Sequence, residues 1–382
     1  MKIQIDGANT INQGAELMIY SVIKEVQRKF PKAEIIYNDN CFTKENRSAN
    51  TFNAGIKFSK KWFHHPIIVK CIQLFRLDII WYKLTGHLIT WQPIKGIDIL
   101  LDISGLYFTD KWPFTSGIVN AYEYYLKTMK KYGTKIYFLP QAFGPIEKKE
   151  TKRMISLICK YGDYIFARDT TSYHFIKPYI NNNNLYLFPD FTNNIIGDLT
   201  AKNQFTKGHV CFIPNKRMID SREGENNNYL SCLFDMISYC IKNKYKVFVL
   251  CHDNGDKDIC KEIGGRMNIP VIKGINAVET KGIISNSYAV ISSRYHGAVS
   301  ALSSCTPCLV TSWSHKYEAL LDDFGQKDKL LDLNDKNSII RALENILNKD
   351  NNTIIRKQLS VSVKNIQYKT LQMWDIIWKN AM

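Results

Sequence analysis

The chain of 382 residues contains no run of about 20 uncharged apolar residues, the length that a helix needs to cross a bilayer. The most apolar segment, residues 62–91, is interrupted by Lys70, Arg76, Asp78 and Lys83. We therefore expect no transmembrane helix. Trp, Tyr and basic residues among Ile and Leu are typical of a helix at a membrane interface. An amphipathic helix packed on its own domain fits this segment equally well, and the sequence leaves both interpretations open.

Other sequence signatures that would assign a functional class are also missing. The ten cysteines lack the spacing of a disulfide framework, and no GxGxxG or Walker pattern indicates NAD or ATP. The sequence has no basic run or basic–aromatic repeat of the kind that binds nucleic acid, so we do not expect nucleic acid as a partner. The chain begins with the apolar segment 2–5 rather than a signal peptide, and we therefore expect a cytoplasmic protein.

Positive charge is the clearest compositional bias. The chain has 51 Lys and Arg against 35 Asp and Glu, a net charge of +16 and a pI of about 9.2. Such an excess favours anionic partners. Because nucleic-acid motifs are missing, an anionic lipid surface or a phosphorylated substrate is the preferred interpretation. The composition otherwise fits a globular protein, with 45% hydrophobic and 23% charged residues.

The hydrophobic pattern predicts an α/β protein with two Rossmann-like domains, whose parallel sheets face a central cleft. Short apolar runs, typical of buried parallel strands, occur at residues 2–5, 34–37, 97–102, 135–139, 164–167, 209–213, 246–251, 288–292 and 307–311. Helical periodicity lies between them, for example at 14–29, 117–131, 227–243 and 256–267. Because the alternation breaks between about 190 and 208, we expect domains at 1–195 and 205–350 and a helical tail at 351–382.

Ligands of open α/β sheets bind at the carboxyl ends of the strands, so the segments after the strands hold the candidate site residues. Several of these segments carry a polar side chain or a turn that suits a ligand. These residues are Asn12 after the first strand, Asp102, Ser104 and Gly105 after the strand at 97–102, Gln141 after the strand at 135–139, and Asp190 at the end of the first half. A structural role as a cap or a turn fits them as well.

Cationic side chains follow two further strands. Arg168 closes an apolar strand, where its guanidinium can bind a carboxylate or phosphate, or pair with Asp169. Arg294 and His296 follow another strand, and Gly297 opens the next helix. A fixed cation and a titratable imidazole beside a helix amino terminus suit an anionic reactant.

Together these motifs resemble those of the polysaccharide pyruvyl transferase family. The most specific is Ser-Arg-Tyr-His-Gly at 293–297. Supporting motifs follow the order of the family: Asn-Gln-Gly-Ala-Glu at 12–16, Gln-Ala-Phe-Gly-Pro at 141–145, Ala-Arg-Asp at 167–169 and Ser-His-Lys-Tyr at 314–317. The resemblance covers roughly residues 2–325. Two positions depart from the pattern of the family: Ala15 stands where an acid is common, and residues 102–105 replace a more glycine-rich turn. These departures affect the expected acceptor-binding site more than the expected donor-binding site.

The resemblance implies a GT-B-like fold and an enzyme that moves the enolpyruvyl group of phosphoenolpyruvate onto a sugar. The product is a cyclic ketal on a precursor of a surface or capsular polysaccharide, and neither a metal nor another cofactor is implied. The implied donor-binding residues are Arg168, Arg294, His296, Gly297 and Lys316. Among them His296, as general acid/base, and Arg294 are the catalytic residues. Lys316 is also interpretable as a solvated lysine in the first turn of a helix.

The resemblance places the donor on the C-terminal domain and the acceptor on the N-terminal domain. The acceptor-binding candidates are Asn12, Asp102, Ser104, Gly105, Gln141 and Asp190. Because the chain is basic and carries the segment 62–91, our working hypothesis is a sugar linked to polyprenyl diphosphate. The protein would then lie peripherally on the inner face of the cytoplasmic membrane, in contact with anionic lipid.

Two other functions remain open. A GT-B-type nucleotide-sugar glycosyltransferase would need a carboxylate in the second half that reads the nucleotide, and Glu279 is the candidate. A non-catalytic subunit of a polysaccharide assembly complex is disfavoured, because a decayed site would be free to lose its arginines and histidine. His252, Asp253 and Asp256 also follow a strand, but one histidine and two acids on a loop are weak evidence for a metal site.

Overall fold

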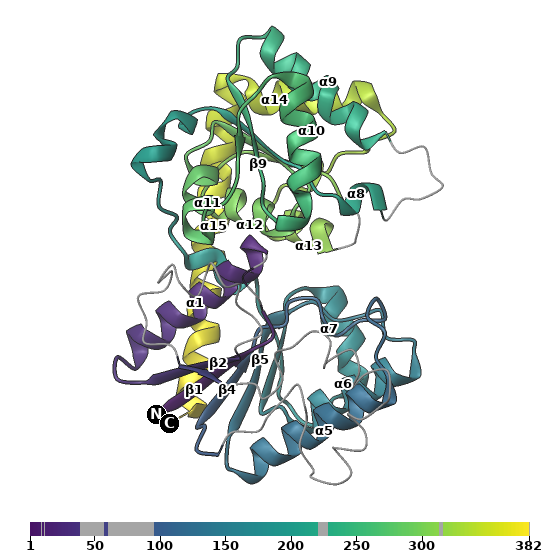
Figure 1. Ribbon diagram of the computed structural model, residues 1–382, viewed down its shortest axis with the longest axis vertical. Coiled ribbons are helices and arrows are strands. Elements are labelled where there is room, and N and C mark those ends of the chain that lie inside the picture. The colour runs from purple at the N-terminus through teal and green to yellow at the C-terminus, as the bar shows by residue number, and fades with distance from the viewer. Residues whose placement is uncertain are drawn as a thin grey trace. The chain divides into compact units, whose positions relative to one another are not determined.

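The computed structural model describes residues 1–8, 10, 12–38, 57–59, 95–220, 228–312 and 316–381. The chain forms two compact units (Figure 1). Unit 1 consists of Met1–Thr10, Val22–Pro189 and Gln372–Met382, and unit 2 consists of Ile11–Ser21 and Asp190–Leu371. The segment 62–91, for which we expect an interfacial or amphipathic helix, lies outside the described residues.

Unit 1 contains a parallel sheet of seven strands in the order β3-β2-β1-β4-β5-β6-β7. The strands are β1 (Lys2–Asp6), β2 (Glu34–Asn38), β3 (Lys57–Ser59), β4 (Ile99–Asp102), β5 (Lys135–Gln141), β6 (Tyr164–Ala167) and β7 (Leu185–Leu187). Its helices include α5 (Ser116–Lys131), α6 (Lys149–Tyr161), α7 (Thr170–Ile176) and the 3-10 helix η2 (Lys177–Tyr179). Helices α5 and α6 lie beside the sheet of unit 1 (Figure 1). Their buried side chains join those of β4 and β5 in one hydrophobic core.

Unit 2 contains a second parallel sheet, of five strands in the order β10-β9-β8-β11-β12. The strands are β8 (Val210–Ile213), β9 (Val247–Leu250), β10 (Val271–Ile272), β11 (Ala289–Ser292) and β12 (Cys308–Val310). The α-helices around them are α8 (Arg217–Asp220), α9 (Tyr229–Lys242), α10 (Lys257–Met267), α11 (Ala277–Ser285), α12 (Tyr295–Ser303), α13 (Lys316–Asp323) and α14 (Lys336–Leu347). The 3-10 helices are η3 (Phe191–Asn194), η4 (Ala201–Thr206), η5 (Asn254–Asp256) and η6 (Lys327–Lys329).

The strand orders confirm the predicted α/β class. In each unit the first strand lies inside the sheet, and later strands are added on both of its sides. This reversal of strand order creates a switch point between β1 and β4 and another between β8 and β11, where ligands of such sheets bind. Strands β4, β8, β9 and β11 are buried along their whole length, as their mainly apolar sequences predict.

Two helices contribute residues to both units. Helix α1 (Gln13–Lys29) begins in unit 2 and continues into unit 1, and α15 (Lys349–Ala381) passes from unit 2 into unit 1 at Gln372. The expected C-terminal tail is therefore one continuous helix that belongs to both compact units. None of the helices in the described part of the chain is long and apolar enough to cross a membrane.

Candidate functional site

The segment that follows β11 is held in place by a network of hydroxyl groups. Ser293 Oγ lies 2.7 Å from Tyr229 Oη and accepts a hydrogen bond from Thr311 Oγ1 at 2.7 Å. The carbonyl oxygen of Ser293 accepts from Tyr317 Oη at 2.9 Å and from Asn215 Nδ2 at 2.9 Å. All of these polar groups are buried and hydrogen-bonded, so the network fixes the backbone from which Arg294 and His296 project.

Arg294 precedes α12, and its guanidinium is bonded to two carboxylates. Nε and Nη2 donate to the two oxygens of Asp256 at 2.7 and 2.6 Å, and Nη1 donates to Asp253 Oδ2 at 3.1 Å. Burial by itself lowers the pKa of Arg294, but the hydrogen bonds and charge of Asp256 outweigh it, and the net pKa is raised. Arg294 is thus a permanently charged, rigidly held side chain whose charge is balanced inside the protein.

The start of α1 is connected to the same network. Asn12 Oδ1 accepts hydrogen bonds from the amides of Gly14 and Ala15, as a helix cap does. Its Nδ2 donates to Asp253 Oδ2 at 2.7 Å. Asn12, predicted to bind the acceptor, therefore uses its side chain to cap α1 and to join this helix to the carboxylate that holds Arg294.

His296 lies in the first turn of α12, and its ring is close to two other segments of unit 2. Its Nε2 is 3.4 Å from Oδ2 of Asp190, whose side chain is 1% exposed. On the side of α1, the ring lies against Gly14, where a Cβ would come within 2.2 Å of Nδ1. A glycine is required here, because any side chain would collide with the imidazole.

The carboxylate beside His296, Asp190, lies in a buried region that also contains Lys281. The second oxygen of Asp190, Oδ1, accepts from Thr192 N at 2.9 Å and from Thr192 Oγ1 at 2.6 Å. Lys281 Nζ donates to the carbonyl oxygen of Thr192 at 2.9 Å. Burial lowers the pKa of Lys281 to about 7, although the charge of Asp190 acts in the opposite direction. Lys281 could not be selected from the sequence alone, because it lies in the short helix α11, which carries no recognisable motif.

Lys316 and Gly297 complete the predicted donor residues of unit 2. Lys316 is only 8% exposed, and its ammonium group lies 5.2 Å from the ring centre of Tyr295 and 5.5 Å from that of Tyr317. The solvated interpretation of Lys316 is therefore wrong, because two aromatic rings cover the cation. A Cβ at Gly297 would lie 2.6 Å from Ser292 Oγ, so the close packing of α12 on β11 accounts for this glycine.

The predicted site residues of unit 1 also lie close to one another, at the carboxyl ends of its strands. Asp102 Oδ1 accepts from the amide of Ser104 at 3.0 Å and from Gln141 Nε2 at 3.3 Å. Burial raises the pKa of Asp102 to about 7, against the hydrogen bonds from Ser104. The carbonyl oxygen of Gln141 accepts from the amide of Arg168 at 3.0 Å, and Gly105, with φ +70°, bonds the amide of Ala142. These contacts bring all five unit 1 candidates into one cluster.

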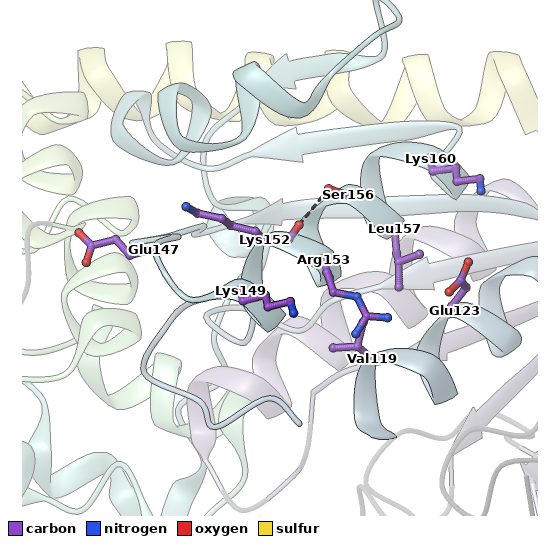
Figure 2. A pocket seen from close by; sticks show the side chains of 9 residues that line it. All are labelled: Val119, Glu123, Glu147, Lys149, Lys152, Arg153, Ser156, Leu157 and Lys160. Atoms are coloured by element: carbon purple, nitrogen blue, oxygen red, sulfur yellow. Dashed lines mark hydrogen bonds between the residues drawn. The ribbon is translucent and has the colours of Figure 1, made fainter. Parts of the chain in front are cut away.

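A separate pocket of unit 1 lies between α5 and α6 and contains none of the predicted site residues (Figure 2). Its lining combines cationic and anionic side chains with a few small or apolar ones: Val119, Glu123, Glu147, Lys149, Lys152, Arg153, Ser156, Leu157 and Lys160. Arg153 in this pocket is bonded to Glu150 at 2.7 Å and to Asn120 at 2.8 Å. The mixed charges and internal pairing give this pocket no evident preference for an anion.

The sequence comparison connects this chain with a known family. The sequence profile described as polysaccharide pyruvyl transferase matches residues 12–315, which confirms the resemblance of the motifs. A comparison with curated proteins finds no significant match.

Solved structures are similar to the chain along nearly its whole length. The UDP-GlcNAc 2-epimerase from Neisseria meningitidis bound to UDP-GlcNAc has a TM-score of 0.60 at 11% identity and covers 99% of this chain and 100% of its own. S. aureus MnaA, in a co-structure with UDP, has a TM-score of 0.60 at 11% identity, and the match covers 100% of this chain and 97% of MnaA. Anabaena Alr3699/HepE in complex with UDP and glucose has a TM-score of 0.58 at 9% identity, and the match covers 99% of this chain and 98% of Alr3699/HepE. These likenesses confirm the GT-B-like fold, and at such identities they show the fold alone.

Proposed function

Because the chain belongs to the polysaccharide pyruvyl transferase family, we propose that it transfers the enolpyruvyl group of phosphoenolpyruvate to a sugar as a cyclic ketal. The observation that carries this proposal is the group of residues at the start of α12. An imidazole beside a buried carboxylate and a fixed guanidinium lie there, at the switch point of the unit 2 sheet, and the buried ammonium of Lys316 lies 5.2 Å from the ring centre of Tyr295, the residue between them in the sequence. Such a set suits a small dianionic donor and proton transfer.

Lys316 is the principal donor-binding cation of unit 2 in this proposal. Phosphoenolpyruvate carries a phosphate and a carboxylate, and a partly desolvated ammonium attracts either group strongly. The first turn of α12 contributes backbone amides and the positive end of the helix dipole. Arg294 differs from Lys316, since Asp253 and Asp256 balance its charge. Three of its five N–H groups serve these carboxylates, so we assign it to donating hydrogen bonds from a fixed position.

His296 is the proposed general acid/base. It delivers a proton to the methylene carbon of the enol, which leaves an oxocarbenium-like centre at the adjacent carbon. One sugar hydroxyl adds to that carbon, the bond from carbon to the phosphate oxygen breaks, and a second hydroxyl closes the ketal. Of the two hydroxyl protons released, one replaces the proton that His296 gave to the methyl group. The other leaves with inorganic phosphate, so the atoms and charges balance.

Unit 1 supplies the proposed acceptor side. Asp102 suits a sugar hydroxyl because its raised pKa leaves the carboxyl able both to donate and to accept hydrogen bonds near neutral pH. Ser104 and Gln141 donate hydrogen bonds to this carboxyl, and the carbonyl oxygen of Gly105 accepts from the amide of Ala142, the residue after Gln141. Arg168 belongs to the same cluster, and its predicted contact with the donor stays a prediction.

A nucleotide-sugar glycosyltransferase is the second candidate, because three structural neighbours were solved with UDP or UDP-GlcNAc. The contacts of Glu279, the carboxylate that would bind the nucleotide, argue against this second function. Its Oε1 accepts from Thr200 Oγ1 and, at 2.6 Å, from Asn203 Nδ2. Glu279 therefore connects η4 to α11, and this observation argues against a nucleotide-sugar donor.

Isothermal titration of the purified protein with phosphoenolpyruvate and, separately, with a panel of UDP-sugars tests the donor. We expect phosphoenolpyruvate to bind and the UDP-sugars not to bind. Lys316→Met removes the charge and keeps most of the apolar volume, so affinity should fall about tenfold or more, the value of one charge-assisted contact. Lys336→Met, which removes an exposed lysine of α14, is the matched control. Binding of a UDP-sugar without phosphoenolpyruvate would overturn the proposal.

A further inference from the structure

The contact between Asp190 and His296 carries an inference that rests on the proposed function and deepens it. We propose that Asp190 is a positioning residue, which keeps the neutral His296 ring protonated on Nε2 and so leaves Nδ1 as the nitrogen that exchanges protons with the substrate. The sequence interpretation of Asp190 as an acceptor-binding residue is replaced by this role. The side chain of Asp190 is 1% exposed, and its two oxygens face Thr192 and His296.

Asp190 is held so that one of its oxygens faces the imidazole. Oδ1 receives both the amide and the hydroxyl of Thr192, at 2.9 and 2.6 Å, and these two bonds fix the rotation of the carboxylate. Oδ2 then lies 3.4 Å from His296 Nε2. A buried carboxylate acceptor favours the ring nitrogen that carries the hydrogen, because an unprotonated nitrogen would place two lone pairs against each other.

The opposite side of the ring is fixed by α1. Gly14 lies so close that a Cβ at this position would be 2.2 Å from Nδ1, 2.5 Å from Cγ and 2.7 Å from Cβ of His296. The ring therefore has little room to rotate about its Cβ–Cγ bond, and Asp190 and Gly14 together determine its orientation. A defined orientation is what a proton donor to a carbon atom requires, since the transfer depends on distance and angle.

Charged groups around this pair come from four other segments. Lys281 on α11 bonds the carbonyl oxygen of Thr192 and interacts with the charge of Asp190. Arg294 precedes α12, and His252 after β9 is fully buried, with a pKa lowered to about 3 by burial first and then by Arg294 and His296. Glu16 on α1 is largely buried two residues beyond Gly14. The charge of Asp190 therefore acts on two titratable groups, His296 and Lys281.

Nitrogen-15 NMR of the ligand-free protein, labelled at histidine and assigned with His296→Gln, tests the proposal. We expect the wild-type spectrum to show neutral His296 with its proton on Nε2. Asp190→Asn removes the negative charge but retains a side chain that caps η3. It should lower the titration midpoint of His296 by about one pH unit or more and produce a mixture of tautomers. Lys281→Met should move the midpoint upwards, because it removes the competing cation.

Asp335→Asn is the matched control, since Asp335 is also a capping carboxylate of unit 2 but caps α14. It should leave the signals of His296 unchanged. A wild-type proton on Nδ1, or an unchanged midpoint in Asp190→Asn, would overturn the proposal. The tautomer is measured on the wild-type protein and His296→Gln serves only to assign its signal, so a poorly folded Asp190→Asn does not remove the test. Because no phosphoenolpyruvate is present, a failure here is distinct from a failure of the proposed donor.

Discussion

Glu16 illustrates how burial changes the chemistry of a single side chain in this protein. It lies in the first turn of α1, and desolvation raises its pKa from 4.5 to about 7, although a backbone hydrogen bond with Ala277 lowers it. Between these two values the unfolded chain has an ionised Glu16 and the folded protein has a protonated one. The unfolded state then binds fewer protons, so the stability falls as the pH rises from 4.5 to about 7.

Replacement of Glu16 by Gln should therefore flatten part of the pH dependence of stability. The free energy of unfolding, measured by urea denaturation from about pH 5 to about pH 8, should fall less steeply in Glu16→Gln, with a difference of the order of a few kcal/mol. Glu318→Gln changes an exposed first-turn glutamate of α13 and is the matched control. An identical slope in wild type and Glu16→Gln would contradict the assigned burial effect.

Single residues also show where sequence reasoning succeeds and where it stops. His296 and Arg294 could be predicted because their position after an apolar strand places them at the carboxyl edge of a parallel sheet. The partners that define the chemistry of these two residues could not be predicted. Asp253 and Asp256 reach Arg294 from another strand end, and Lys281 reaches Thr192 across 89 positions of sequence. Such contacts depend on how β9, α11 and η3 pack, which a local pattern does not specify.

At the level of elements, the first turns of α1 and α12 pack against each other inside unit 2. Gly14 allows this approach, and a Cβ there would overlap the His296 ring. We expect Gly14→Ala to destabilise the protein by roughly 1–3 kcal/mol, since a well-packed site must move to accept the methyl group. The displaced ring should also lose the Nε2 tautomer that Asp190 selects.

Gly265→Ala is the matched control for Gly14→Ala. Gly265 is an exposed glycine of α10 with no atom within 4 Å of an added Cβ. Alanine there should stabilise the helix by up to about 1 kcal/mol, because it reduces the freedom of the unfolded chain. Chemical denaturation of both variants should give changes of opposite sign. Equal stability of Gly14→Ala and wild type would mean that the two helix starts do not pack as described.

Most elements could be predicted from hydrophobic periodicity, and the exceptions have a physical reason. Strands β1, β2, β4, β5, β6, β8, β9, β11 and β12 all fall within or close to the predicted apolar runs. Strands β3, β7 and β10 are only two or three residues long, and each lies at an edge of its sheet. Segments this short carry too few residues for a period to be seen, and their pairing depends on the neighbouring strand.

At the scale of the whole molecule, the sequence alone could not show how the chain is divided between units. The break in periodicity after residue 190 indicates one boundary, but α1 and α15 each contribute to both units. These contributions depend on contacts between distant parts of the chain, for example Trp378 Nε1 donating to Glu25 Oε1 at 3.0 Å in unit 1. Hydrophobic periodicity identifies both helices and gives no information about the unit that each half joins.

The most direct test of the account is the product that the enzyme makes. The protein is incubated with phosphoenolpyruvate and the lipid-linked glycans extracted from cells that produce it, and the glycans are examined by mass spectrometry. We expect one glycan to gain the mass of one pyruvate less one water, with an equal amount of inorganic phosphate released and neither change with His296→Gln. A glycan that instead gains a sugar when a UDP-sugar replaces phosphoenolpyruvate would contradict the account.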